Sequence, residues 1–249
     1  MKNQQALQNL IHEVDAVLVL AGAGMSADSG LQTFSQASKD WKKNYQTFMT
    51  RHAFEVDKEN AWAFYENMYK KYIYESKPHQ GYFDLLNQLK DKDYFIVTSN
   101  IDLLFEKAEF DLDRIHHVHG RIDKLQCKQP CNNHLYVYSN TLRYCSRCGS
   151  SLRPNTFLFD DALERRIIGN TASMFLKWCT NIDGLKTLIL EIGVGSEGLH
   201  SHSISYAKKL NAKHILINPY PPIFSKQSKA KVYKLKAVDM LKTKSHKDK

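Results

Sequence analysis

Apolar residues along the chain fall into two patterns, short continuous runs and longer stretches at helical spacing. The short runs, which are typical of strands buried on both faces, lie at residues 16–20, 94–98, 186–192 and 213–218, and the histidine-rich segment 115–120 is predicted as a further strand. Helical spacing marks the segments between them, at residues 5–13, 57–75, 79–90, 102–109 and after 196. Strands that alternate with helices predict an α/β fold, an open, parallel, Rossmann-like sheet with helices on both faces.

Residues 121–155 interrupt this alternation. They contain four of the five cysteines in two close pairs, with three residues inside the first pair and two inside the second, which are Cys127, Cys131, Cys145 and Cys148. Four thiolates at this spacing are typical of a closed tetrahedral zinc site with a structural role. The alternative is four free buried cysteines. Cys179 stands alone in a helical context, and we expect it in the core.

Composition and charge narrow the class of protein further. Hydrophobic residues make up 43% and charged residues 24%, which is typical of a globular chain. The net charge of +9 lies partly in the lysine-rich tail at 241–249, and the rest would suit an acidic or phosphate-bearing partner. No basic stripe interleaved with aromatic residues favours nucleic acid, and no apolar run approaches the roughly 20 residues that cross a bilayer. Paired cysteines favour metal in a reducing compartment, so we expect an intracellular, cytoplasmic protein.

A glycine-rich loop follows the first predicted strand. It reads Gly22-Ala23-Gly24-Met25-Ser26 and continues to Gly30. Ligands of open parallel sheets bind at the carboxyl ends of the strands, and glycines allow a backbone to approach a diphosphate closely. The third glycine lies too far along for the dehydrogenase pattern, and an ordinary turn between strand and helix is the alternative.

Several motifs in order resemble one known family. The pattern Gly-Ala-Gly-x-Ser-x-x-Ser-Gly-Leu at 22–31 is similar to the opening motif of sirtuins, and Thr98-Ser99-Asn100-Ile101-Asp102 resembles their Thr-Gln-Asn-Ile-Asp element. His119-Gly120 matches the catalytic His-Gly pair, and the cysteine segment follows it as the zinc ribbon does in that family. The segment 152–161 resembles the strand that pairs with the substrate peptide, and 193–196 and 217–218 resemble the nucleotide loops. The chain is therefore identified as a divergent, bacterial-type sirtuin.

The resemblance implies a role for each matching residue. His119 would be the general base and Asn100 would order the ribose and the reacting water. Asp102 would hold the nicotinamide carboxamide and Phe34 would shield the nicotinamide ribose. NAD would also contact Gly22, Ala23, Gly24, Ser26, Gly30, Ser99, Gly193, Gly195, Ser196 and Asn218. From the residues alone, Asn100 and Asp102 could be helix caps, His119 an interior histidine and 152–161 a core strand.

Four departures from the family pattern bear on the activity. Ser35 replaces an arginine that contacts phosphate, Ser99 replaces a glutamine, Asp160 a glycine, and Phe157 a small residue of the acyl channel. The pattern Tyr65-x-x-Met68 replaces the Tyr-x-x-Arg of enzymes for acidic acyl groups, so we expect neutral acyl groups, with acetyl first among them. The resemblance implies an NAD-dependent deacylase of acylated-lysine proteins that releases nicotinamide and acyl-ADP-ribose. ADP-ribosyl transfer or NAD hydrolysis, or weak binding without turnover, are the alternatives.

The same reading divides the chain into modules. Residues 1–120 and 156–240 are expected to form the NAD-binding domain, with a helical subdomain at about 36–80. Residues 121–155 are expected to form the zinc module with one zinc ion, and 241–249 a solvated basic tail.

Overall fold

The computed structural model describes residues 2–129, 131, 133–161, 169–195, 197–221 and 229–243. Ser196 and most of the basic tail lie outside the described residues.

A six-stranded parallel sheet forms the centre of the larger lobe. Its strand order is β3-β2-β1-β7-β8-β9. The strands are β1 (Ala16–Ala21), β2 (Asp93–Thr98), β3 (Ile115–His117), β7 (Thr187–Ile192), β8 (Lys213–Ile217) and β9 (Lys231–Tyr233). Every residue of β1 and β7 is buried, as expected of central strands covered on both faces. The chain builds outward from this pair in both directions, so the sheet has its topological switch point between β1 and β7.

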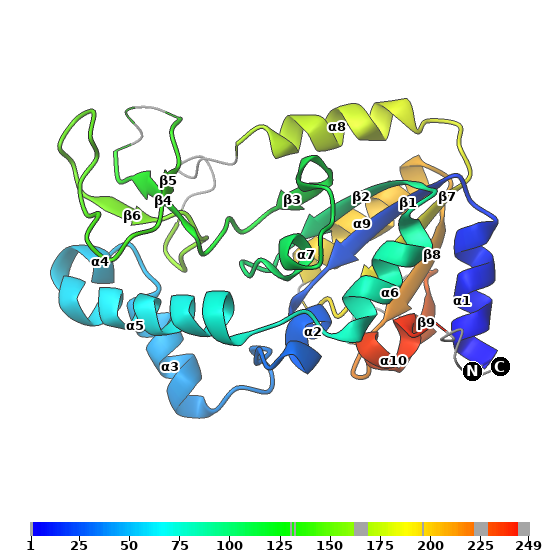
Figure 1. Ribbon diagram of the computed structural model, residues 1–249, viewed down its shortest axis with the longest axis horizontal. Coiled ribbons are helices and arrows are strands. Elements are labelled where there is room, and N and C mark those ends of the chain that lie inside the picture. Colours follow the sequence, from blue (N-terminus) through cyan, green and yellow to red (C-terminus); the bar gives the residue numbers. More distant parts are fainter. Residues whose placement is uncertain are drawn as a thin grey trace.

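Helices cover both faces of this sheet (Figure 1). One face carries α1 (Lys2–His12), α6 (Gln80–Leu89), α7 (Leu104–Lys107) and α10 (Ala237–Leu241), and the other carries α8 (Thr171–Asn181) and α9 (Glu197–Lys209). Alternate strand residues explain this division, because Val17 and Val19 pack with the first group while Leu18 and Leu20 pack with the second. The predicted fold class is confirmed.

A smaller lobe lies beside the sheet (Figure 1). It contains α3 (Lys39–Phe48), α4 (Ala53–Val56) and α5 (Lys58–Lys70), which continues into a π-helical turn (Lys71–Glu75). It also contains an antiparallel sheet of order β5-β4-β6, formed by β4 (Lys124–Cys127), β5 (Tyr136–Val137) and β6 (Leu152–Pro154). Helices and sheet share one hydrophobic core, in which Trp62 and Tyr65 of α5 pack with Leu125 and Tyr138. The cysteine segment and the helical segment are therefore one packing unit.

Some elements differ from the pattern in the sequence. The strand predicted over 115–120 ends at His117, so His119 lies beyond it in a turn that closes at Gly120 with φ of 75°. The helix predicted over 102–109 is the single turn α7, because Glu109 adopts a φ of 66° and ends it. The glycine loop contains the short helix α2 (Ala23–Ser26) and a 3₁₀ turn (Ala27–Ser29).

No helix of the described residues combines the length and the apolar character that a membrane span requires.

Candidate active site

Two glycine loops meet at the switch point of the sheet. The Gly22 N–H donates to the Ile192 carbonyl at 2.9 Å, and the Gly24 N–H donates to the Gly193 carbonyl at 2.9 Å. A Cβ on Gly22 would lie 2.7 Å from the Gly193 oxygen, and a Cβ on Gly193, whose φ is 61°, would lie 2.3 Å from the Met25 nitrogen. Glycine is thus required because the two backbones touch. The N–H groups of Gly22 and Gly24 join the two loops to each other. The crevice beside them is where sheets of this topology bind ligands.

A buried hydrogen-bond network joins the glycine loop to the loop after β2. The Asn100 side chain donates to the Gly22 carbonyl at 3.0 Å and to the Ser26 hydroxyl at 2.9 Å. The Ser26 hydroxyl donates to Asp102 at 2.7 Å, and Tyr82 contacts the same hydroxyl at 3.0 Å. The hydroxyl of Ser26 has a single proton, so Tyr82 donates to it. The structure therefore brings together Gly22, Ser26, Asn100 and Asp102, which the sequence analysis named in two separate motifs.

Burial sets the electrostatics of this network. Asp102 is buried, and desolvation raises the pKa of its carboxyl group, although the hydrogen bonds from Ser26 and the Leu104 N–H oppose the shift. The Leu104 N–H lies at the start of α7, so the Asp102 carboxylate contacts both that turn and Ser26. The role of Asp102 in the site stays a prediction.

The imidazole of His117 contacts the same loop. Its Nδ1 contacts the Asn100 carbonyl at 2.8 Å and its Nε2 contacts Glu106 at 2.8 Å. A carbonyl oxygen only accepts, so Nδ1 carries a proton. Burial lowers the pKa of His117, but the Glu106 carboxylate outweighs burial and the pKa lies above its ordinary value. The sequence analysis gave His117 no role and missed this contact with the Asn100 loop.

His119 lies at the same edge of the sheet. The Val118 N–H donates to the Thr98 carbonyl at 2.9 Å, which fixes the chain beside the end of β2. The imidazole stacks on Phe157 with ring centroids 5.6 Å apart and planes 19° apart, and the Phe157 N–H donates to the His119 carbonyl at 2.8 Å. The next residue must be glycine, because a Cβ on Gly120 would lie 1.8 Å from the Asn155 oxygen. His119 is therefore held from both sides of its backbone.

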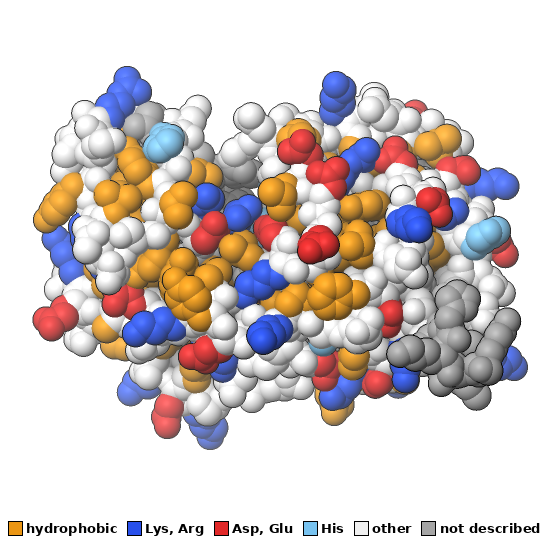
Figure 2. Space-filling model, in the orientation of Figure 1, with side chains coloured by type: hydrophobic (Ala, Val, Ile, Leu, Met, Phe, Trp, Pro, Cys, Tyr) orange, Lys and Arg blue, Asp and Glu red, His pale blue; other side chains and the backbone are white. Residues whose placement is uncertain are grey.

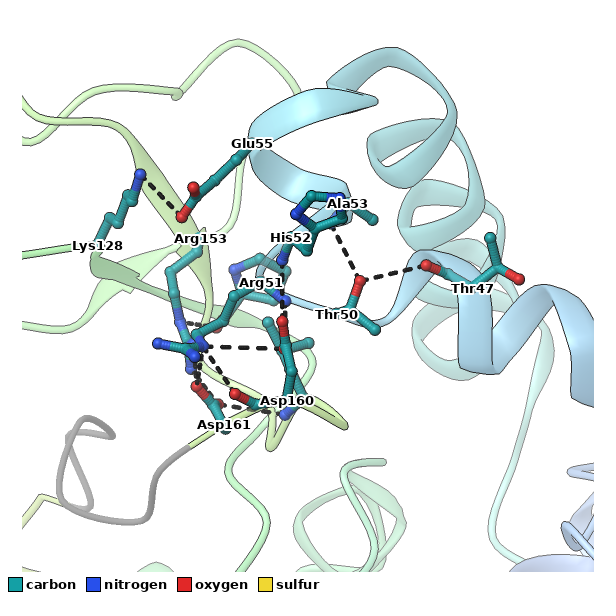
Figure 3. A network of polar contacts seen from close by, with 12 residues as sticks. Thr47, Thr50, Arg51, His52, Ala53, Glu55, Lys128, Arg153, Asp160 and Asp161 are labelled. Carbon is teal, nitrogen blue, oxygen red and sulfur yellow. Dashed lines mark hydrogen bonds and ion pairs between the residues drawn. The ribbon is translucent and has the colours of Figure 1, made fainter.

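The segment after β6 also contacts the turn before α4 in the smaller lobe (Figure 3). The Asp160 carboxylate accepts from the backbone N–H groups of Arg51 at 2.6 Å and His52 at 3.0 Å, at the turn before α4. Arg153 forms a two-pronged ion pair with Asp161, at 2.5 and 2.6 Å, with side chains that are 6% and 0% exposed. Residues 152–154 pair with β4, so the core-strand interpretation holds for that part.

Of the other predicted contact residues, Asn218 and Phe34 have described interactions. The Asn218 side chain donates to the Val194 carbonyl at 3.1 Å and so joins the loops after β7 and β8. Phe34 is 43% exposed and packs edge-on against Trp41 and Tyr45. The Lys42 ammonium group donates to the Ser35 carbonyl at 3.2 Å, which places a positive charge beside the position of the missing arginine.

The four cysteines of residues 127–148 converge in the smaller lobe. Their Sγ atoms lie within 4.8 Å of one another, and three of the pairs are 3.5, 3.6 and 3.8 Å apart. Four sulfurs about 2.3 Å from a tetrahedral zinc ion would be about 3.8 Å apart, so the donor set fits this metal. Cys179 lies away from them in α8 and is buried, as predicted.

The sequence profile of the Sir2 family matches residues 22–186, which is more than half of the chain. The chain belongs to the Sir2 family. A similar relative is the NAD-dependent protein deacylase 1 of Archaeoglobus fulgidus, 31% identical over 174 residues that cover 66% of this chain and 68% of that protein.

Other curated relatives of this sirtuin have different names. The NAD-dependent protein deacylase of Aquifex aeolicus is 29% identical over 59% of this chain and 62% of that protein. The protein ADP-ribosyltransferase of Staphylococcus aureus is 28% identical over 57% of this chain and 47% of that protein. The matches thus span about half to two thirds of the length of these relatives.

Solved sirtuin structures share the fold. A Sir2 homologue in complex with NAD aligns with a TM-score of 0.74 at 22% identity, over 95% of this chain and 90% of that one. A structure solved to explain sirtuin substrate affinity aligns with a TM-score of 0.73 at 18% identity, over 95% and 96% of the two chains.

Proposed function

We propose that this sirtuin is an NAD-dependent protein-lysine deacylase for neutral acyl groups. The observation that carries the proposal is the convergence of His119, Asn100 and the Gly22 loop on one edge of the sheet, at its switch point. The reaction would convert NAD, an acylated lysine and water into nicotinamide, free lysine and acyl-ADP-ribose.

NAD and one structural zinc ion are the implied cofactors. NAD supplies an ADP-ribosyl group whose bond to nicotinamide breaks readily, because its departure neutralises a pyridinium. The crevice beside the touching glycine loops suits its diphosphate, and Asn218 and Gly195 would lie at its adenosine end. Zinc bound by Cys127, Cys131, Cys145 and Cys148 would hold the smaller lobe together, because Cys127 and Cys145 belong to the core shared with α5.

His119 would act as the general base on the 2′-hydroxyl of the ribose. Its position on a backbone held at Gly120 and Phe157 keeps the imidazole at a fixed place, which a proton acceptor needs. Asn100 would orient the ribose, and Asp102 would hold the carboxamide through the network that includes Ser26. Phe34 would cover the ribose face from the segment that leads into α3.

The burial of Tyr65 and Met68 supports neutral acyl groups. The Tyr65 side chain is fully buried and its hydroxyl donates to the Ile122 carbonyl, while Met68 packs in the same core. Neither position offers a cation to an acidic acyl group. An acylated protein is the partner that we propose, within the cytoplasm. Nucleic acid is not proposed, and charged side chains of both signs are interspersed on the described part of the face in Figure 2.

ADP-ribosyl transfer or NAD hydrolysis is a second candidate. Ser35 and Ser99 stand where sirtuins have residues that contact the nucleotide, and the S. aureus relative is named for ADP-ribosyl transfer. Transfer has less need of a base at His119, so the products distinguish the two reactions.

Product analysis with variants at His119 tests the proposal. Incubation with NAD and an acylated-lysine peptide should yield acyl-ADP-ribose by mass spectrometry, and His119→Ala should lower its rate by at least 100-fold while NAD still binds. The exposed His12→Ala is the matched control and should keep full activity. Free ADP-ribose or a modified protein without acyl-ADP-ribose would favour the second candidate, and full turnover by His119→Ala would remove His119 from the mechanism.

A further inference from the structure

A buried carboxylate lies among apolar residues in the centre of the sheet. Glu191 of β7 is 0% exposed, and its partners in the neighbouring strands are Leu20 of β1 and Leu216 of β8. Two residues further along the chain, Gly193 belongs to the pair of touching glycine loops. An ionised carboxylate is stable in such a place only where hydrogen-bond donors surround it. The side chains packed against Glu191 therefore have to supply those donors.

Two histidines and a serine supply them. The Nδ1 atom of His200 lies 2.8 and 2.9 Å from the two oxygens of Glu191. The Ser203 hydroxyl donates to the carboxylate at 2.6 Å, and Nε2 of His214 lies 3.0 Å from it. Burial raises the pKa of the Glu191 carboxyl group, but these bonds outweigh burial and hold the pKa below its ordinary value. A carboxylate only accepts, so both of these histidine nitrogens carry a proton.

This network fixes α9 on the sheet. His200 and Ser203 are three residues apart in α9 and so lie on the same face of the helix, while His214 belongs to β8. Apolar packing has no preferred direction, whereas a hydrogen bond is formed only over a narrow range of distances and angles. Donors on the helix that point at a carboxylate in a central strand therefore set where α9 lies along β7 and how it is rotated.

The position of α9 affects the loop that follows β7. The first half of this loop is held by the backbone of Gly193, which donates to the end of β8 at 2.8 Å, and by the Asn218 side chain, which donates to the Val194 carbonyl. Gly195 is exposed, and the chain enters α9 at Glu197, less than one helical turn before the first histidine of the network. The second half of the loop thus follows the first turn of the helix.

We infer that Glu191 is a positioning residue for NAD, which acts through α9 to hold the Gly195 end of the loop where the nucleotide binds. Glu191 is fully buried under the helix, so it acts on the nucleotide only through other residues. The inference rests on the proposed function, because it takes the crevice beside Gly193 as the place of the diphosphate. Loss of the carboxylate weakens NAD binding and leaves the chemical step at His119 unchanged.

Calorimetric titration with ADP-ribose tests the inference without any reaction. Glu191→Gln keeps the size of the side chain and removes its charge, so it should raise the Kd for ADP-ribose by about fivefold or more. Ser203→Ala removes one bond to the same carboxylate and should raise the Kd by a smaller factor. Arg114→Met is the control, because it breaks an ion pair with Asp93 at the amino end of β2, away from the site, and should bind ADP-ribose as the parent does.

Steady-state kinetics distinguishes positioning from a general loss of structure. With NAD and an acylated-lysine peptide, Glu191→Gln should raise the KM for NAD by a factor similar to that for the Kd, while kcat at saturating NAD stays within about twofold of the parent value. Partial unfolding would lower the amount of active enzyme and hence the apparent kcat, with KM unchanged. Circular dichroism of each variant measures the folded fraction.

The results separate this inference from the deacylase proposal. An unchanged Kd for ADP-ribose in folded Glu191→Gln and Ser203→Ala proteins would overturn the inference, and so would a lower kcat with the KM for NAD unchanged. If Glu191→Gln does not fold, the milder Ser203→Ala decides by the same criterion. Weaker binding of ADP-ribose by the variants, with a parent protein that forms no acyl-ADP-ribose, would support the role of Glu191 and contradict the deacylase proposal.

Discussion

The imidazole of His117 contacts the backbone carbonyl of Asn100 and so fixes the Asn100 loop. Sequence analysis did not identify this residue beside the site. The sequence shows three histidines within four residues but gives no sign that the second contacts Glu106, which lies in a different element. A contact between two segments of this kind is set by tertiary packing, which the local pattern does not contain. Gly22, Gly24 and the four cysteines were visible in advance because a turn or a metal imposes a spacing on the chain itself.

The pair of His117 and Glu106 should make stability depend on pH. The pKa of His117 lies above its ordinary 6.5, since Glu106 outweighs the effect of burial. The pKa of Glu106 lies below its ordinary 4.5, since burial is outweighed by His117 and Arg121. A histidine whose pKa is raised by folding stabilises the folded state at low pH, and this contribution is lost as the pH rises through the pKa of the folded state. The glutamate, whose pKa is lowered, loses its contribution only in acid.

Urea unfolding of His117→Gln and of the parent between pH 5 and pH 9 measures this. Relative to His117→Gln, the parent should lose free energy of unfolding as the pH rises above 6.5. His12→Gln, at an exposed histidine, should follow the parent curve. Parallel curves for the parent and His117→Gln would show that the pair does not stabilise the fold.

At the scale of elements, the long periodic segments were predictable and the short ones were not. Strands β1, β2, β7 and β8 and helices α1, α5 and α6 lie close to the predicted ranges, because each has a continuous or periodic apolar pattern. The short α10 and β9 have too few residues to show a period, although Leu241 and Tyr233 are buried. The role of the 155–161 segment was also hidden, because it depends on its contacts with the turn before α4.

The ion pair of Arg153 and Asp161 should stabilise the 155–161 segment more than any other single interaction does. Replacing Arg153 by Met leaves a buried carboxylate whose remaining partners are Arg51, 3.6 Å away, and the Leu158 N–H at 3.2 Å, and should cost about 3–5 kcal/mol of the free energy of unfolding. Urea denaturation measures the cost. Lys213→Met breaks an exposed pair with Glu13 and should change stability by less than about 0.5 kcal/mol.

A double variant completes this test. Arg153→Met with Asp161→Leu removes both charges, so it should recover most of the loss. A single Arg153→Met change that costs no more than Lys213→Met would contradict the interpretation that this pair fixes the segment beside His119.

At the scale of the whole molecule, the glycine loops proposed to bind NAD and the cysteines of the zinc site lie in different lobes. The larger lobe provides the glycine loops, the Asn100 loop and His119, and the smaller lobe beside it contains helices that share a core with Cys127 and Cys145. The predicted alternation of strands and helices was enough to derive the larger lobe. The packing of residues 39–68 with residues 122–152 joins distant segments of the chain and could not be derived from either one alone.

A crystal structure of this protein with ADP-ribose bound tests the central claim most directly. We expect the diphosphate in the crevice beside Gly22–Ser26 and Gly193, with a ribose hydroxyl within about 3.2 Å of the His119 imidazole. A nucleotide bound elsewhere, or in that crevice with its ribose turned away from His119, would contradict the account.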